Sequence, residues 1–255
     1  GYTFSGWSET YGGAKEYDKG QTLSASTVSR MYKDCNGGTY NIYTTWTANK
    51  YKIHFDKNAT EAKGSMADMD MVYDVAKNLS ENKFSREGYT FQGWNTAKNG
   101  SGTSYDDKAL VNNLTAAPNG TVTLYAQWTA NTYTITYVYN NGSANTTATY
   151  NIEQAITLPS PTKTGYTFAG WKVTTAGGNW KTTDSVYKGT VAAGKYGNVT
   201  LTAQWTVNTY TITYKYNNGA ADTTAKYTIE QSITLPSPTK TGYTFAGWKV
   251  TTAGG

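Results

Sequence analysis

The chain has few residues of the kinds that build catalytic, metal-binding or membrane-spanning proteins. Among its 255 residues are one cysteine, Cys35, and one histidine, His54. A transition-metal site needs several such ligands, and a nucleophile needs a neighbouring base. No apolar run reaches the roughly 18 residues of a membrane-spanning helix. We therefore expect no enzyme activity, no cofactor, no metal site and no membrane insertion in this segment.

Charged side chains are scarce as well. They make up 15% of the residues, and the net charge of +5 is spread along the chain without a cluster of Lys and Arg. A nucleic-acid-binding surface gathers basic side chains on one face, so we expect no nucleic-acid partner. A single cysteine also leaves no disulfide within the chain. Stability must then come from the packing of aromatic side chains, which are abundant at 23 Tyr, 8 Trp and 6 Phe.

The most informative feature that is present is an internal repeat. Two phrases recur, one reading Gly-Tyr-Thr-Phe-x-Gly-Trp and one ending in Gln-Trp or Thr-Trp. The first begins at Gly1, Gly88, Gly165 and Gly242, and the second closes at Trp46, Trp128 and Trp205. The last two intervals of the first phrase are both 77 residues. Fixed spacing of this kind indicates tandem copies of one small module.

The spacing predicts two complete modules and two partial ones, each bounded by a Trp-Thr-x-Asn segment. The predicted segments are the leading part (1–47, the C-terminal part of a module), the first full repeat (48–128), the second full repeat (129–205) and the trailing part (206–255, the N-terminal part of a module). The interval from Gly1 to Gly88 is 87 residues. We place its extra residues in surface loops at Met31–Gly38 and Asn58–Asp70, because polar loops tolerate insertions.

Alternation of side chains predicts strands in every module. Tyr133, Ile135 and Tyr137 alternate with Thr, which is typical of a half-buried strand. The glycine before the tryptophan of the recurring phrase suggests a β-bulge or a close approach of another backbone segment. We expect about one helical turn over Asn151–Ala155 and over the corresponding Asp74–Asn78. The fold class is therefore mainly β, or α+β, with a small mixed sheet and one short helical turn in each ~77-residue module.

Three phrases occur in a constant order and resemble a known family. They are an opening Tyr-x-Ile-x-Phe/Tyr strand, the Gly-Tyr-Thr-Phe-x-Gly-Trp phrase, and Thr-Leu-Tyr-Ala-Gln-Trp, and the closest stretch is Tyr51–Trp128. Together they resemble the Listeria–Bacteroides repeat, which is similar to the internalin B repeat. The resemblance implies a β-grasp-like module that occurs in tandem in secreted or surface proteins of bacteria and some archaea. It implies no catalytic residue, cofactor or metal ligand.

Two side chains are candidates for contacts with other molecules. Trp180 lies in the polar loop 172–190, which departs from the corresponding loop 95–103, and it occurs in one copy only. We predict it to be an exposed contact residue. Cys35 lies beside Asn36-Gly-Gly in a predicted loop and is a candidate intermolecular thiol, because an odd cysteine in a secreted protein sometimes pairs with another chain. An incidental free thiol and a lone exposed apolar residue are the alternatives.

These observations predict an extracellular structural segment, namely a stalk, spacer or fibre of an adhesin-like protein on a bacterial or archaeal cell surface. Its partners would be neighbouring repeat modules or copies of itself. The linkers Thr129-Ala-Asn-Thr and Thr206-Val-Asn-Thr are too short for free tumbling, so we predict a semi-rigid rod. The alternative is a module that binds a glycan or a host surface protein through loops 95–120 and 172–198.

The two chain ends suggest two further hypotheses, because Gly1–Ala14 and Gly242–Gly255 lie at nearly the same position of the repeat. The chain is either a window on a longer repetitive protein or a subunit whose partial modules complete each other head to tail.

Overall fold

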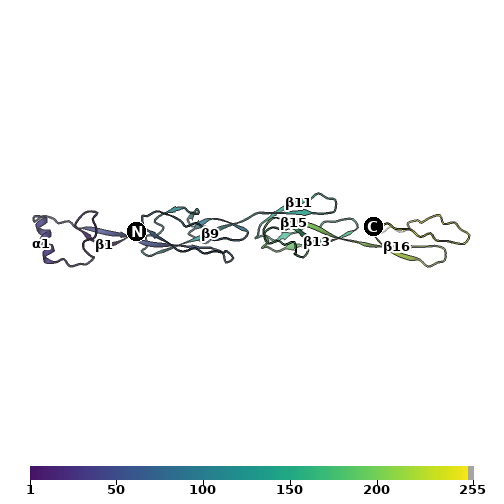
Figure 1. The fold of residues 1–255 in the computed structure, drawn as a ribbon, viewed down its shortest axis with the longest axis horizontal. Coiled ribbons are helices and arrows are strands. Elements are labelled where there is room, and N and C mark those ends of the chain that lie inside the picture. Colours follow the sequence, from purple (N-terminus) through teal and green to yellow (C-terminus); the bar gives the residue numbers. More distant parts are fainter. Residues whose placement is uncertain (252–255) are drawn as a thin grey trace. The chain divides into compact units, whose positions relative to one another are not determined.

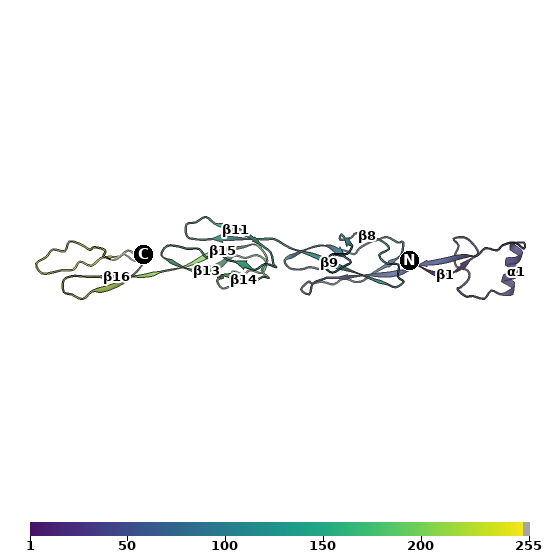
Figure 2. The same cartoon turned by 180° about the vertical axis from the view of Figure 1, so that it is seen from behind.

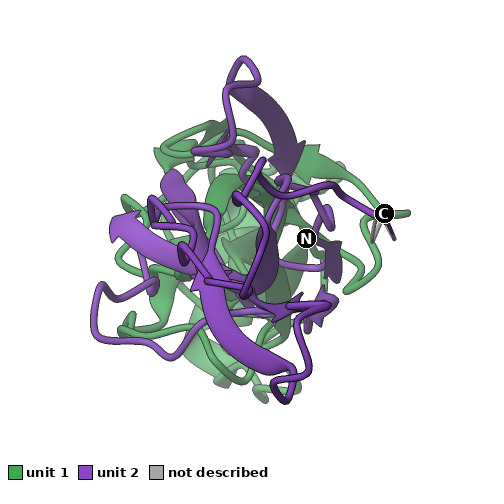
Figure 3. Cartoon of the chain, turned by 90° about the vertical axis from the view of Figure 1, so that its right-hand side faces the viewer, with its two compact units in different colours: residues 1–130 green, residues 131–255 purple. Residues whose placement is uncertain are grey.

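The computed structural model describes residues 1–251, so the last four residues of the predicted trailing part lie outside the described residues. The chain divides into two compact units, residues 1–130 and residues 131–255 (Figure 3). Each unit contains one predicted full repeat and one predicted partial repeat. The boundaries at 48, 129 and 206 stay a prediction. The structure is mainly β, as expected, and its described part contains a single α-helix (Figures 1 and 2).

The first unit contains a two-stranded hairpin and a five-stranded sheet. The leading part contributes β1 (Tyr2–Ser8), α1 (Ala25–Asp34) and β2 (Tyr43–Ala48), and β1 pairs antiparallel with β2. The first full repeat contributes β3 (Lys50–Asp56), β4 (Met69–Val72), β5 (Lys77–Asn78), β6 (Tyr89–Asn95), β7 (Ser104–Tyr105), β8 (Leu110–Val111) and β9 (Thr121–Ala130). Its sheet has the order β4-β3-β9-β6-β7, and β5 pairs with β8. The first and last long strands, β3 and β9, are neighbours and run parallel.

The second unit repeats this arrangement. Its strands are β10 (Tyr133–Val138), β11 (Thr146–Tyr150), β12 (Ile156–Thr157), β13 (Tyr166–Thr175), β14 (Thr190–Val191), β15 (Val199–Val207), β16 (Thr209–Tyr214) and β17 (Thr223–Thr228). The sheet has the order β11-β10-β15-β13, with β10 parallel to β15, and β12 pairs with β14. The trailing part forms the antiparallel hairpin β16–β17.

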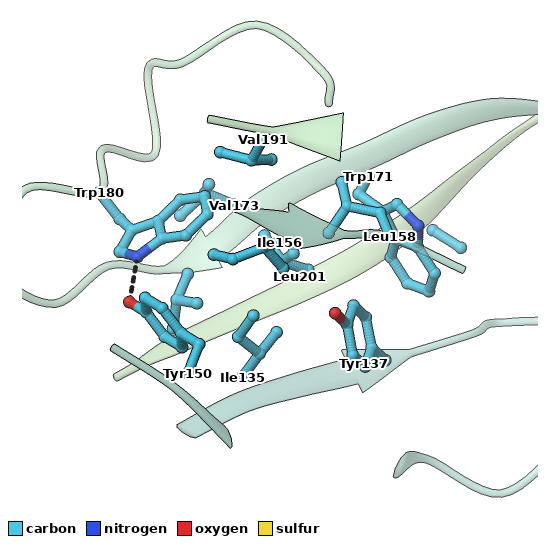
Figure 4. Close-up of a cluster of buried hydrophobic side chains, with 12 residues drawn as sticks. Ile135, Tyr137, Tyr150, Ile156, Leu158, Trp171, Val173, Trp180, Val191 and Leu201 are labelled. Atoms are coloured by element: carbon cyan, nitrogen blue, oxygen red, sulfur yellow. Dashed lines mark hydrogen bonds between the residues drawn. The ribbon is translucent and has the colours of Figure 1, made fainter. Parts of the chain in front are cut away.

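The alternation seen in the sequence decides which side of each strand is buried. In β3 the residues Tyr51, Ile53 and Phe55 are buried and the intervening residues are exposed. The tryptophan of the recurring phrase, Trp94 or Trp171, lies fully buried at the centre of each core. Each buried aromatic side chain removes roughly 150–250 Å² of its surface from water, so a few of them stabilise a core that is small in residue number. Figure 4 shows the second core, with Trp171 near Tyr137 and Leu158.

The two central tryptophans differ in how their indole N–H is satisfied. Trp171 Nε1 donates to the carbonyl of Pro159 at 2.8 Å. Trp94 Nε1 is buried and has no hydrogen-bond partner among the described residues. An unsatisfied buried donor costs about 1–3 kcal/mol, so aromatic packing around Trp94 has to outweigh this penalty.

The predicted bulge lies at the glycine before the tryptophan. The pairing register shifts between Phe91 and Gly93 in β6, and the same shift occurs in β1 and β13. Gly93 has a φ of +129°, which L side chains rarely adopt, and a Cβ there would lie 2.7 Å from the carbonyl oxygen of Tyr105. Glycine is therefore required both by the backbone conformation and by the close approach of β7.

The prediction of a helical turn over Asp74–Asn78 and over Asn151–Ala155 is wrong. Residues 74–78 and 151–155 contain hydrogen-bonded turns, such as Gln154 N–H to Asn151 O at 3.2 Å, and then lead into the short strands β5 and β12. A helix of one turn gains little against the cost of nucleation, whereas an extended segment pairs with β8 or β14. Ile156 and Leu158 from this segment are buried in the second core.

The helix α1 of the leading part (Ala25–Asp34) extends into the loop that was expected at Met31–Gly38. Its N-cap Ser24 accepts a hydrogen bond from Thr27 N–H, and Met31 is buried on one face. Arg30 of the helix pairs with Glu9, which also accepts hydrogen bonds from Tyr17 and Tyr40. Arg30, followed by the two tyrosines, lowers the pKa of Glu9 to about 2. These contacts hold α1 against the end of the β1–β2 hairpin.

The glycine bulge generates a testable prediction. Replacing Gly93 by alanine should lower the free energy of unfolding of the first unit by about 2–3 kcal/mol, because it adds a clash with Tyr105 to backbone strain. Gly247 is a matched control, since it occupies the same place in the phrase at φ +127° with no atom within 4 Å of a built Cβ. Gly247→Ala should cost only about 1 kcal/mol. Denaturant unfolding followed by tryptophan fluorescence measures both, and equal effects would contradict the role given to the clash.

Candidate functional site

The best-defined polar site in the first unit is the junction between the leading part and the first full repeat. Strands β2 and β3 are separated by one residue, Asn49, which is buried. Its backbone N–H donates to Gly1 O at 2.8 Å, and its carbonyl accepts from Tyr73 N–H at 2.9 Å. Its side chain accepts from Thr3 Oγ1 at 2.6 Å and donates to Ala116 O at 2.8 Å. One residue thus binds both sides of the junction.

A hydrogen bond between a tyrosine and an acidic side chain also links the leading part to the first full repeat at this junction. The Tyr2 hydroxyl donates to Asp74 Oδ2 at 2.5 Å, and the rings of Tyr2 and Tyr73 meet edge to face with centroids 5.6 Å apart. Asn113 also donates to Asp74, at 2.6 Å. The hydrogen bond from Tyr2, followed by the one from Asn113, holds the pKa of Asp74 below its ordinary value.

The second unit has the same junction between the second full repeat and the trailing part. Strands β15 and β16 are again separated by one residue, Asn208. Its N–H donates to Gly165 O at 2.9 Å, and its side-chain oxygen accepts from Thr167 Oγ1 at 2.6 Å. The Tyr166 hydroxyl donates to Glu230 at 2.6 Å, which raises the pKa of Tyr166. A tyrosine–acid pair therefore occurs at both junctions, with Asp in one and Glu in the other.

Packing at the second junction is tight. A Cβ built on Gly165 would lie 2.8 Å from Ile229 Cγ2, just as a Cβ on Gly1 would lie 2.1 Å from the Tyr73 ring. Gly1 and Gly165 both open the recurring phrase, so this glycine lets the neighbouring repeat come close. Sequence reasoning missed the site. The signal that could have found it is the Trp-Thr-x-Asn segment, which had been used only to mark boundaries.

Trp180 corrects one sequence prediction, because it is not an exposed contact residue. It is only 2% exposed, and its Nε1 donates to the Tyr150 hydroxyl at 2.7 Å, which in turn donates to Gly197 O at 2.6 Å (Figure 4). The ammonium group of Lys195 lies 4.8 Å from the ring centroid. The loop that carries Trp180 folds back over the core, so the indole ring of Trp180 is packed inside the second full repeat.

The corresponding loop of the first full repeat is held in place by a buried asparagine instead of a buried tryptophan. Asn95 is fully buried, and its side chain donates to Gly100 O, Gly102 O and Ser104 Oγ while accepting from Ala97 N–H and Gly102 N–H. In the second full repeat this position is Lys172, and Trp180 supplies the packing instead. Asn95 is thus a loop-organising residue that was not singled out in the sequence.

The remaining candidates form no site with several converging groups. Cys35 is the C-cap residue of α1 and half-buried, with its thiol 3.3 Å from Tyr32 O, so it ends a helix instead of lying in a loop. Its pairing with another chain stays a prediction. His54 Nδ1 lies 2.8 Å from Asp68 on an exposed surface. Within residues 1–251, no three His, Cys, Asp or Glu side chains gather as metal ligands would, and no helix has the length and apolarity to cross a membrane.

Comparisons with known proteins match most of the chain to one kind of repeat. The Listeria-Bacteroides repeat domain matches residues 51–127, 133–204 and 210–255. A protein of Evansella cellulosilytica provisionally named a Gly-rich membrane protein is 32% identical over 255 residues, which is 97% of this chain and 27% of that protein. A second protein of this organism, provisionally named a membrane protein, is 28% identical over 217 residues, 81% of this chain and 29% of its own length.

A relative from another organism is similar over a shorter stretch. Internalin H of Listeria monocytogenes is 40% identical over 130 residues, which is 48% of this chain and 20% of internalin H. The chain therefore spans less than a third of the length of each of these curated relatives.

The buried asparagine of the first junction can be tested by substitution. Asn49→Ala removes two side-chain hydrogen bonds and leaves Ala116 O and Thr3 Oγ1 without them, so local stability should fall by about 1–3 kcal/mol. Hydrogen exchange followed by mass spectrometry should show faster exchange in peptides on both sides of residue 49. Asn99→Ala is the control, since its side chain is exposed and bonds only to Ser101. Exchange unchanged at the junction would show that Asn49 is dispensable.

The tyrosine–acid pair predicts a dependence on acid pH. The pKa of Asp74 is lowered in the folded chain, so its stabilising effect is present above the ordinary value of 3.8 and is lost as pH falls through the lower folded value. Tyr2→Phe removes the hydrogen bond that contributes most to the lowered pKa of Asp74, so this pKa should rise toward 3.8. An NMR titration of the Asp74 carboxyl carbon measures the shift. Tyr11→Phe, at an exposed tyrosine of the same unit, should leave the titration unchanged.

Proposed function

We propose that this chain, which belongs to the Listeria-Bacteroides repeat domain family, is a structural spacer in a bacterial surface protein. The observation that carries the proposal is the connection between repeats. In both junctions one hydrogen-bonded asparagine, Asn49 or Asn208, separates the last strand of one repeat from the first strand of the next. Asn49 is hydrogen-bonded to the repeats on both sides, whereas Asn208 is bonded to the second full repeat and the Tyr166–Glu230 pair reaches the trailing part. A one-residue linker held by such bonds cannot swing freely, so each junction keeps the direction of the chain.

The sheet topology supports the same role. The first and last strands of a full repeat run parallel, β3 with β9 and β10 with β15. Because parallel strands point the same way, the chain begins a repeat at one end of its sheet and leaves it at the opposite end. A repeat built in this way advances the chain by its own length, roughly 30–40 Å for a domain with a radius of gyration near 11–12 Å.

The names of the relatives support a proposal for the setting of the spacer. They are named as membrane proteins of Evansella cellulosilytica and as internalin H of Listeria monocytogenes. These names support a place at the bacterial cell surface, and we propose that the segment is extracellular and separates a membrane or wall attachment from an adhesin-like region. The order β11-β10-β15-β13 supports a β-grasp-like fold in which the extended segment around β12 covers the core in place of a helix.

A role in binding glycans or host proteins has less support. The side chain that favoured it, Trp180, is buried and bonded to Tyr150, so it offers no platform for a sugar ring. The spacer is therefore the function that we propose, and it is not enzymatic.

Small-angle X-ray scattering of the whole chain tests the spacer. The wild-type chain should give the profile of a semi-rigid particle, since the linkers between successive repeats are one residue long at Asn49 and Asn208 and two residues long at Asn131 and Thr132. Inserting Gly-Ser-Gly-Ser after Asn208 should broaden the distance distribution, because a flexible linker of four residues spans about 5–6 Å × √4 and removes the fixed direction. The same insertion in the turn after Gly219, within the β16–β17 hairpin, is the control. A wild-type profile as broad as that of the Asn208 insertion would overturn the proposal.

A further inference from the structure

Strand β11 is an open edge of the sheet in the second full repeat. It stands first in the order β11-β10-β15-β13 (Figure 1), and residues 146–149 are all exposed. The opposite edge, β13, is partly covered, because Trp171 and Tyr187 exchange two backbone hydrogen bonds of 2.8 Å. Among the described residues, no strand pairs with the outer side of β11. Because β11 lies within a full repeat, this open edge is not caused by a missing strand, and such an edge can accept a further strand.

The outward-facing backbone groups of this edge belong to Thr147 and Thr149. On the other side of β10, Thr134 N–H donates at 2.9 Å to the side chain of the residue that precedes β15. Backbone groups alternate in direction along a strand, so Ile135 directs its own groups toward β11, where it lies opposite Ala148. Thr147 and Thr149, on either side of Ala148, then direct their N–H and C=O groups away from the sheet. The edge therefore offers two donors and two acceptors to another strand.

The corresponding edge strands of the other copies carry charged side chains. By the registers of the hairpins, Thr149 corresponds to Asp70 of β4 and to Lys226 of β17. Both Asp70 and Lys226 are exposed. Charged side chains on an edge strand oppose its pairing with another chain. Strand β11, which reads Thr-Thr-Ala-Thr-Tyr, has no such side chain and so lacks this protection.

The side chains of β11 favour a second copy of the same strand as the partner. Paired with itself, an uncharged strand brings no like charges together, and it offers no charge that would select a partner of opposite sign. Thr147 and Thr149 lie opposite Thr136 and Thr134 within the sheet, and cross-strand pairs of threonine stabilise antiparallel strands. The donors and acceptors of Thr147 and Thr149 also lie symmetrically about Ala148, so the edge is complementary to itself.

We infer that two copies of this chain pair through β11, antiparallel and about a two-fold axis, so that the two four-stranded sheets become one. Ala148 of one copy lies opposite Ala148 of the other, and Thr147 of each copy lies opposite Thr149 of the other. This register uses every outward N–H and C=O group of Thr147 and Thr149, whereas a shift by two residues leaves some of them unpaired. The inference goes beyond the spacer role, because it gives the repeat a lateral partner.

The pairing is expected to be closed and weak. A two-fold contact uses the same edge of both copies, so it gives dimers that do not grow into longer assemblies. One pair of short strands should bury less than the roughly 1,200 Å² of a stable complex, which corresponds to a Kd on the order of 0.1–1 mM.

Disulfide trapping tests the register on the full chain. Ala148 is exposed, so Ala148→Cys in a chain carrying Cys35→Ser should leave each copy folded. The two Ala148 positions form a non-hydrogen-bonded pair with Cα atoms about 4.5 Å apart, within the range of about 4.4–6.8 Å that a disulfide needs. Mild oxidation should therefore give a covalent dimer, and no larger species, in a gel without reductant.

Ala225→Cys in the same Cys35→Ser background is the matched control. Ala225 lies opposite Ile212 in β17, as Ala148 lies opposite Ile135 in β11, but its neighbour is Lys226. It should give much less dimer. Titration with a maleimide shows beforehand whether the two thiols are equally accessible. Equal yields of dimer from equally accessible thiols, or no dimer from Ala148→Cys, would overturn the inference.

A charge placed on the edge tests the pairing without a cross-link. Thr149→Lys gives β11 the residue that β17 has at Lys226, and in the dimer it places two ammonium groups on diagonal positions about 7–8 Å apart. Light scattering coupled to size exclusion should show dimers of the wild-type chain as its concentration approaches about 1 mM and only monomers of Thr149→Lys. Thr190→Lys is the control, since Thr190 is exposed on β14, outside this sheet, and dimers should persist.

Denaturant unfolding followed by tryptophan fluorescence should show that both lysine variants are folded. A wild-type chain that stays monomeric throughout this range, or dimers that survive Thr149→Lys, would contradict pairing through β11. Either result would leave the spacer role standing, because scattering from the monomer tests that role separately.

Discussion

The parallel pairing of the first and last strands of each full repeat is the constraint on which the rest of the structure depends. In the second unit, β10 is the first strand of the repeat in the sequence and lies in the middle of the sheet. Its parallel neighbour β15 is the last strand of the same sheet in the sequence. Because β10 and β15 are direct neighbours, β11 and β13 take the two edges of the sheet, and the β12–β14 region contributes Ile156, Leu158 and Val191 to the core. The same strand β15 then continues through Asn208 into the next repeat, so closing one sheet also positions the start of another.

The cores show how far side chains can vary within this constraint. Trp94 and Trp171 occupy the same central place, yet only Trp171 finds an acceptor for its indole N–H among the described residues, at Pro159. The loops after these tryptophans are organised by a buried amide in one repeat, Asn95, and by a buried indole in the other, Trp180. The two repeats share the pairings of their four long strands, whereas the fifth strand β7 of the first sheet is replaced in the second repeat by an isolated bridge between Trp171 and Tyr187. The side chains that organise the loops after the two tryptophans also differ.

The sequence was most informative where the signal was periodic. Alternation gave the strands and the buried faces of β3 and β10, the recurring glycine gave the bulge, and the phrases led to the family that the comparisons confirmed. The errors arose where tertiary contacts decide. Helix α1 depends on Arg30 reaching Glu9 and on Met31 being buried, and Trp180 is buried because its loop folds back onto Tyr150. Neither contact is visible in local composition.

The junctions were missed for a related reason. Trp-Thr-x-Asn was recognised as a boundary, but the value of its asparagine comes from Gly1, Thr3 and Ala116, which are distant in the sequence. The linkers are short, as predicted. One residue, Asn208, separates β15 from β16 within Thr206-Val-Asn-Thr, and two residues, Asn131 and Thr132, separate β9 from β10 within Thr129-Ala-Asn-Thr.

The parallel ladder also determines how a full repeat responds to mechanical load. A pull on the two ends of the second full repeat draws the beginning of β10 and the end of β15 in opposite directions along their own axes. The hydrogen bonds between these strands, from Ile135 to Val138, are then loaded together in shear instead of being opened one after another. A repeat that shares tension across a whole ladder resists extension more strongly than a hairpin such as β16–β17, whose strands can be unzipped from their open end.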